Sequence, residues 1–89
     1  MKTPAYSTQF KRDYKTAQKR GYDTAKLQEI VLLLLEGKPL PPELRDHALS
    51  GKYKDRRDCH LEPDWLLVYK PEKTRIVFER TGTHSDIFG

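Results

Sequence analysis

The chain has 89 residues, 36% of them hydrophobic and 34% charged, with a formal net charge of +4. This length suits one domain with a small core, and the single cysteine excludes an intrachain disulfide. No apolar stretch has the character of a secretory signal or the length of a membrane span, so we expect a cytoplasmic protein without a membrane partner. The positive charge would suit an anionic surface or an acidic protein, but nucleic acid is the first partner to consider.

The N-terminal region is predicted to contain a short strand and a basic helix. Residues 3–6 form the strand, and the helix extends from a cap at Ser7 or Thr8 to about Arg20. The apolar stripe of this helix consists of Phe10, Tyr14 and Ala17. Its charges are basic except for Asp13, so the helix either docks on ribosomal RNA or presents a solvated face.

A second helix is predicted from an N-cap at Asp23 to Gly37, which can adopt the left-handed conformation that ends a helix. Its core face consists of Leu27, Ile30, Val31 and Leu34, and Leu32, Leu33 and Leu35 widen the apolar surface. A helix this apolar must be covered on two sides, by the sheet, the first helix or a partner protein. We expect the two helices to pack as an antiparallel hairpin on one face of a sheet.

Strands dominate the second half of the chain, after an irregular proline-rich crossing at residues 38–43. The predicted strands are residues 52–61, 65–70, 75–80 and a short last strand near Ile87. Short connections at residues 62–64 and 71–73 imply antiparallel hairpins. The order β-α-α-β-β-β predicts one α+β domain over residues 1–89, with two helices on one face of a twisted, mainly antiparallel sheet of four to five strands. The other face of the sheet is left for function.

The strand pattern brings polar side chains of the C-terminal half toward one another. Alternation along a strand puts Asp58 and His60 on the same face, and Asp64 begins the next strand close to His60. Arg80 ends the third strand and is expected on the same side as Phe78.

The turn after the third strand brings one further histidine to this region. Gly82 permits a sharp turn before His84. The hairpin topology can therefore gather four side chains from separate elements into one groove: His60, Asp64, Arg80 and His84.

This set of side chains matches what RNA cleavage by the ribose 2′-hydroxyl requires. A base removes the hydroxyl proton, an acid protonates the departing 5′-oxygen, and a cation stabilises the charge on the phosphorane. Imidazole has a suitable pKa for proton transfer near neutral pH, and arginine offers a fixed fork for phosphate. Metal is not needed for this reaction.

Structural explanations compete with each of these assignments. Any of the histidines can be an inert surface residue, Arg80 can form a salt bridge with Glu79 or Asp86, and Asp64 can cap its turn. The aromatic residues expected in the core are Trp65, Tyr69 and Phe78. Phe88, next to the last residue, is as well suited to stacking on a base as to packing.

A metal site at Asp58, Cys59 and His60 is not expected, because Cys59 faces the opposite side of its strand. Cys59 is instead interpreted as a small core residue facing the helices. The sequence contains no paired-cysteine metal spacing and no nucleotide-binding fingerprint. We therefore expect neither a metal nor a cofactor.

Three strings of residues resemble the YafQ branch of the RelE toxin superfamily. They are residues 46–51 (DHALSG), 57–65 (RDCHLEPDW) and 78–84 (FERTGTH), the last continuing to Phe88 and Gly89. The resemblance covers essentially the full chain. It implies a type II toxin that cleaves mRNA, typically in the ribosomal A site, that is neutralised by an antitoxin, and that reaches operator DNA only in the antitoxin complex.

The resemblance also implies an active site. The matching positions are His47, Asp58, His60, Asp64, Arg80, His84 and Phe88. In these terms His84 is the general acid, and Asp64, or His60 oriented by it, is the base. Arg80 stabilises the phosphorane, and His47 holds the phosphate or shares the proton transfer. Asp58 and Phe88 contact the substrate, Phe88 by stacking on a base.

Three alternative functions remain open at this point. A ParE-like toxin shares the fold and acts on DNA gyrase without nuclease activity, although it has no use for a proton-transfer pair. A non-catalytic RNA- or protein-binding module would function through the basic helix alone. An inactive toxin would survive as a partner of its antitoxin.

Overall fold

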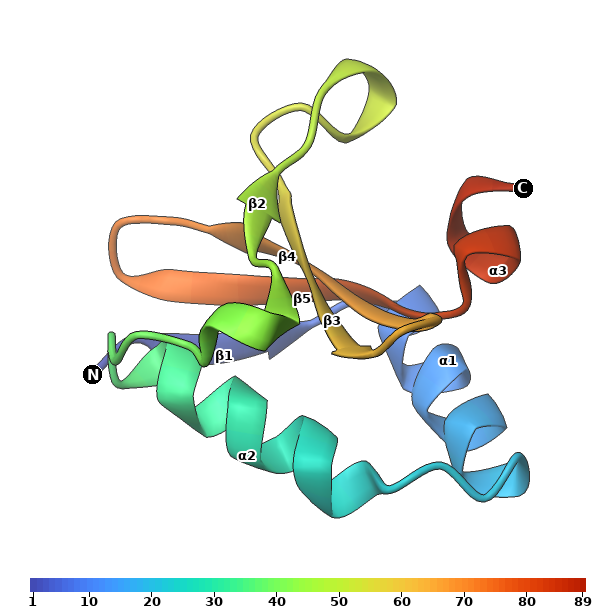
Figure 1. The fold of residues 1–89 in the computed structure, drawn as a ribbon. Helices are drawn as coiled ribbons and strands as arrows, with labels where there is room; N and C mark the ends of the chain where they lie inside the picture. Colours follow the sequence, from blue (N-terminus) through green and yellow to red (C-terminus); the bar gives the residue numbers. More distant parts are fainter.

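A computed structural model describes residues 1–89 and contains a five-stranded sheet with two long helices against one face (Figure 1). The elements are β1 (Thr3–Tyr6), α1 (Thr8–Lys19), α2 (Thr24–Leu35), β2 (His47–Ala48), β3 (Arg57–Glu62), β4 (Trp65–Pro71), β5 (Arg75–Gly82) and α3 (His84–Phe88). Single 3₁₀ turns at Pro42–Leu44 and Gly51–Tyr53 flank β2. The predicted α+β fold is confirmed. No helix has the length and apolar character that crossing a bilayer requires.

Both long helices begin and end where the sequence predicts. The Ser7 side chain accepts a hydrogen bond from the Phe10 N–H at 2.9 Å, and Asp23 caps α2 in the same manner. Gly21 and Gly37 follow the two helices with φ of 76° and 71°, the left-handed conformation that glycine adopts without strain.

The strand order β1-β5-β4-β3-β2 gives a mixed sheet. β1 is parallel to β5, while the other three pairs are antiparallel. The β1 pairing ends at Tyr6 opposite Phe78, so the last residues of β5 have no neighbouring strand on that side. Other groups must satisfy the backbone N–H donors along this open edge.

The helix-facing side of the sheet carries the main core. It joins apolar residues of α1 and α2 to Cys59, Leu61, Trp65, Leu67, Tyr69 and Phe78, all of them buried. Cys59 thus faces the helices, and Trp65, Tyr69 and Phe78 are core residues, as expected. A smaller cluster of Leu66, Val68 and Ile87 lies apart from this core. It belongs to the opposite face, because successive residues of β4 alternate between the two sides.

Two sequence-based predictions about the strands are wrong, and one strand was missed. The strand expected from residue 52 begins at Arg57, because residues 51–53 form a 3₁₀ turn and Asp55 has a φ of 68°. The two-residue strand β2 was not foreseen. The last strand expected near Ile87 is instead α3, because Thr83 and Asp86 form a reciprocal capping box that initiates a helix.

A bulge in β5 also corrects the predicted orientation of Arg80. Tyr69 pairs with Phe78, but the next residue back along β4, Val68, pairs with Arg80, which leaves Glu79 as the extra residue. An extra residue reverses the alternation of side chains beyond it. Arg80 therefore shares the face of Val68, not that of Phe78.

Candidate functional site

The candidate site is built on the sheet face turned away from α1 and α2. Register aligns His47, Asp58, Val68 and Arg80 in one row across β2, β3, β4 and β5. Directly paired residues of antiparallel strands project from the same face. His60, Leu66 and Gly82 form the next row, and α3 begins two residues later with His84. The bulge in β5 thus brings Arg80 onto the face that carries the histidines.

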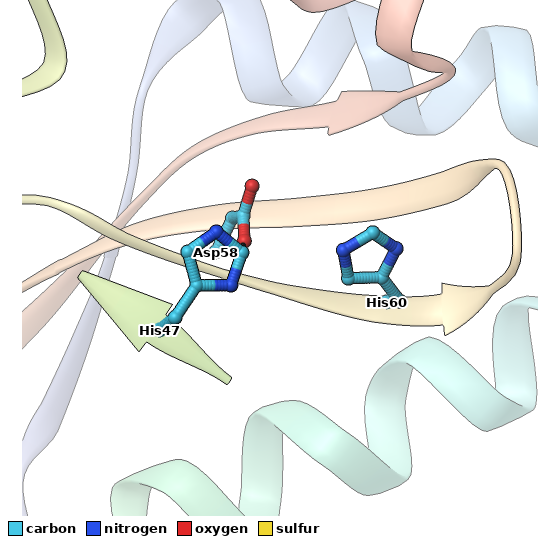
Figure 2. Close-up of side chains that lie close together, drawn as sticks. All are labelled: His47, Asp58 and His60. Carbon is cyan, nitrogen blue, oxygen red and sulfur yellow. Dashed lines mark ion pairs between the residues drawn. The ribbon is translucent and has the colours of Figure 1, made fainter. Parts of the chain in front are cut away.

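Asp58 of β3 is buried, and Figure 2 shows His47 of β2 beside it and His60 further along β3. His47 Nδ1 lies 3.1 Å from Asp58 Oδ1, but it makes a 2.8 Å hydrogen bond with the carbonyl oxygen of Arg45. The single Nδ1 proton of a neutral ring can serve only one acceptor well, and the geometry favours the carbonyl. Asp58 Oδ1 therefore has no hydrogen-bond donor although it is buried.

Burial raises the pKa of Asp58, and the charges of His47, His60 and His84 oppose this rise. A buried carboxylate without a donor is costly to the folded state. Such a group is nevertheless well placed to stabilise positive charge that appears on a neighbouring imidazole.

Asp64 orients His84 at the start of α3. Asp64 Oδ1 lies 2.6 Å from His84 Nδ1 and accepts the His84 backbone N–H at 2.9 Å. These contacts lower the pKa of Asp64, the backbone N–H contributing most and the imidazole next. Nδ1 is engaged, so Nε2 is the ring atom of His84 available for proton exchange. Asp64 was expected near His60, but its hydrogen-bonding partner is His84.

His60 occupies the middle of the histidine group. Its ring centroid lies 6.2 Å from that of His47 and 5.6 Å from that of His84. His60 and His84 also line a groove of about 640 Å³ that extends toward Lys26 and Arg45. Two imidazoles at this separation can both reach one phosphate group bound in the groove.

Arg80 is held along one edge of its guanidinium. Nε donates to Asp13 Oδ2 at 2.8 Å, and Nη2 donates to the Asp86 carbonyl oxygen at 3.1 Å. The hydrogen bond to Asp13 is the main reason that the pKa of Arg80 is raised. Of the partners considered from sequence, Glu79 instead binds Arg56, and Asp86 contributes only its backbone carbonyl.

Phe88 remains largely exposed at the end of α3, with 45% of its surface accessible. Its ring meets Tyr53 edge-to-face at 5.5 Å and lies 6.5 Å from His84. An exposed aromatic ring beside a proton-transfer group is positioned to stack on a nucleotide base.

Sequence reasoning missed two features of this region. His47, Asp58 and His60 each offer a ligand atom within 4.8 Å of the others, and imidazole and carboxylate are ligand types that transition-metal ions accept. Cys59 lies outside this set, as expected. The set was missed because β2 was not foreseen, and without β2 the sequence does not place His47 beside Asp58. Asp13 was also missed, since its contact with Arg80 joins residues far apart in the sequence.

Comparison with known proteins identifies the family of this chain. The family model described as a bacterial toxin of type II toxin-antitoxin system, YafQ, matches residues 2–89. The mRNA interferase toxin YafQ of Escherichia coli K12 is 48% identical over 85 residues, which cover 94% of this chain and 92% of that protein.

Solved structures give the same result. The chain is similar to YafQ in the E. coli DinJ–YafQ complex, with a TM-score of 0.93, 46% identity and 100% coverage of both chains. It is also similar to a metal-bound toxin from Helicobacter pylori, with a TM-score of 0.93 and 40% identity, covering 99% of this chain and 100% of that chain. The chain therefore belongs to the YafQ family of bacterial type II toxins.

Proposed function

We propose that this toxin, an mRNA interferase of a type II toxin–antitoxin system, cleaves mRNA in the ribosomal A site by attack of the ribose 2′-hydroxyl. The observation that carries the mechanism is the pair of imidazoles, His60 and His84, 5.6 Å apart on the face that also carries Arg80. Neither the ParE-like activity nor a purely binding module requires such a pair. Family membership also favours RNA cleavage over both alternatives.

Proton transfer is divided between the two imidazoles. His60 takes the 2′-hydroxyl proton as the oxygen attacks phosphorus, and His84 Nε2 protonates the 5′-oxygen as the P–O5′ bond breaks. The products are a 2′,3′-cyclic phosphate and a 5′-hydroxyl. We assign the base to His60 because Asp64, the other candidate, is engaged with His84.

The remaining side chains bind and orient the substrate. Arg80 stabilises the phosphorane, His47 holds the phosphate, and Phe88 stacks on a base. Asp58 is buried, so it supports substrate binding through its histidine neighbours and balances charge on the imidazole that receives the proton. The reaction requires no metal.

The ribosome and the antitoxin are the proposed macromolecular partners. Lys11, Arg12, Lys15 and Lys19 are exposed along α1 and can bind phosphates of ribosomal RNA. The E. coli relative is solved in a complex with DinJ, and we expect a cognate antitoxin to bind and neutralise this chain as well. Operator DNA would be contacted only by that complex.

A bound transition metal would inhibit this reaction. The H. pylori relative was solved in a metal-bound state, and a metal held by His47, Asp58 and His60 here would occupy the proposed base. We therefore expect toxin that was stripped with EDTA and then desalted to cleave at an unchanged rate, in buffer that keeps the Mg²⁺ that ribosomes need, and added Zn²⁺ to suppress cleavage. Loss of cleavage by the stripped toxin would contradict the metal-free mechanism.

The test is inducible expression followed by mapping of mRNA 5′-ends, together with cleavage of ribosome-bound mRNA by purified protein. We expect cuts within translated codons, 5′-hydroxyl ends on the downstream fragments, and suppression when the cognate antitoxin is co-expressed. Arrest of DNA replication without mRNA cleavage would favour the gyrase-directed alternative. Cleavage of free and ribosome-bound mRNA at equal rates would refute the A-site proposal.

A further inference from the structure

Asp13 is the only acidic residue of the basic N-terminal helix, and it is buried with 9% of its surface exposed. Its carboxylate accepts hydrogen bonds from Arg80 Nε at 2.8 Å, Arg80 Nη2 at 3.4 Å and the Thr81 backbone N–H at 3.0 Å. Gln9 adds a fourth at 3.0 Å from the preceding turn of α1. A buried carboxylate with this many donors has a fixed position.

This carboxylate occupies the open edge of β5. The β1 pairing stops opposite Phe78, so the N–H of Thr81 faces no strand and bonds to Asp13 instead. The same carboxylate binds the Nε edge of Arg80, where the bulge has turned that side chain toward the site. Nη1 is then the donor left for a phosphate oxygen.

The C-terminal end of α1 makes a second connection, to α3. Arg20 binds both carboxylate oxygens of Asp86, at 2.6 and 3.3 Å. Asp86 also accepts the backbone N–H of Thr83 at 2.9 Å and so completes the cap of α3. A Cβ at Gly82 would lie 2.8 Å from Asp86 Oδ2, so the carboxylate packs directly on the chain that leads to His84.

A five-residue helix needs such anchoring, because isolated helices of this length are unstable. α3 carries both the proposed acid, His84, and the proposed stacking ring, Phe88. Arg80 and α3 are therefore both bonded to α1, which packs on the face of the sheet opposite to the site.

We infer that Asp13 and Arg20 are positioning residues of the nuclease site, Asp13 aiming the Arg80 guanidinium and Arg20 holding α3 with His84. This inference rests on the proposed function. It adds that the relative placement of the phosphate-binding group and the proton donor is set by α1. Displacements of about 1 Å in such a site can reduce the rate by about a hundredfold.

The variants are Asp13→Asn, Arg20→Ala and Arg20→Lys, with Glu72→Gln as the matched control. Glu72 is also a carboxylate in an ion pair, but it bonds to Arg75 at the far end of β5. Single-turnover cleavage of ribosome-bound mRNA gives the maximal rate and the half-saturating toxin concentration separately. NMR signals of Arg80 Nε–H and the His84 ring report the two positions without reference to activity.

We expect Asp13→Asn and Arg20→Ala to lower the maximal rate at least tenfold with half-saturation changed less than twofold. Asp13→Asn should shift the NMR signal of Arg80, and Arg20→Ala should shift that of His84. Arg20→Lys should recover part of the cleavage rate, and Glu72→Gln should change neither the rate nor the signals. The exposed ion pair of Arg20 can be lost without unfolding, so a normal cleavage rate in Arg20→Ala would overturn the inference. A normal cleavage rate in a folded Asp13→Asn variant would overturn it too. Unchanged Arg80 and His84 signals in these variants would overturn it as well. If the wild-type protein did not cleave mRNA while the variants shifted the NMR signals as expected, the result would instead count against the proposed function.

Discussion

On the helix side of β3, Cys59 and Leu61 are 0% and 2% exposed among apolar neighbours. On the other side of the same strand, Asp58 is 3% exposed beside His47 (Figure 2). Burial on the helix side removes apolar surface from water and stabilises the fold. Burial of Asp58 leaves a carboxylate oxygen without a donor and opposes folding. Adjacent residues of one strand therefore contribute in opposite ways to stability, and the destabilising one lies in the proposed site.

The largest expected effect is a loss of RNA cleavage without a loss of stability, from a change on the site face of the sheet. His84→Ala removes the proposed general acid, which contributes about 10²- to 10⁴-fold in reactions of this kind. The His84 side chain is 52% exposed, so the variant should melt at nearly the wild-type temperature. Single-turnover cleavage and thermal melting of the same sample measure both quantities. Cleavage near the wild-type rate would remove His84 from the mechanism.

The converse change lies on the helix side. Leu67 is fully buried in the main core, and Leu67→Ala should lower the free energy of unfolding by about 2–5 kcal/mol. Urea unfolding measures this change, with Leu32→Ala as a control because Leu32 is 48% exposed on α2. The folded fraction of Leu67→Ala should cleave RNA at the normal rate. A reduced rate in that fraction would mean that the two faces are not independent.

Asp58→Asn should separate stability from function at one residue. We expect cleavage to fall about tenfold with the loss of charge beside the imidazoles. Burial raises the folded-state pKa of Asp58, so the wild type loses stability as pH rises from the unfolded value of 3.8 through the folded value. The variant lacks this loss and should be the more stable protein at neutral pH, with the advantage disappearing below pH 3.8. The measurement is the free energy of unfolding of both proteins as a function of pH. A wild type more stable than Asp58→Asn at neutral pH would contradict the prediction.

Local patterns predicted one face of the sheet better than the other. Alternation was sufficient to place Asp58 and His60 opposite Cys59, and capping residues were sufficient to delimit both long helices. Arg80 was assigned to the wrong face because a bulge depends on how two strands pair, which single-strand alternation does not reveal.

Sequence reasoning also missed parts of the site that depend on contacts between distant segments. β2 has only two residues and is defined by its pairing with β3. A segment this short has no hydrophobic periodicity that could predict the strand or place His47 beside Asp58. The contact between Asp13 and Arg80 spans 67 positions and has no local signal. The start of α3 could have been found, because Thr83 and Asp86 have the spacing of a capping box.

The smallest expected effect tests the neighbour of Asp58. Burial raises the pKa of Cys59 to about 12, so the folded protein should resist iodoacetamide at pH 8 and react only when unfolded. Cys59→Ala should cost about 1 kcal/mol of unfolding free energy, from the atoms removed from the core, and leave the cleavage rate unchanged. Asp58→Asn is the matched comparison, one position away and equally buried. If Cys59→Ala slowed cleavage as much as Asp58→Asn does, strand alternation would not divide the residues of β3 between fold and function.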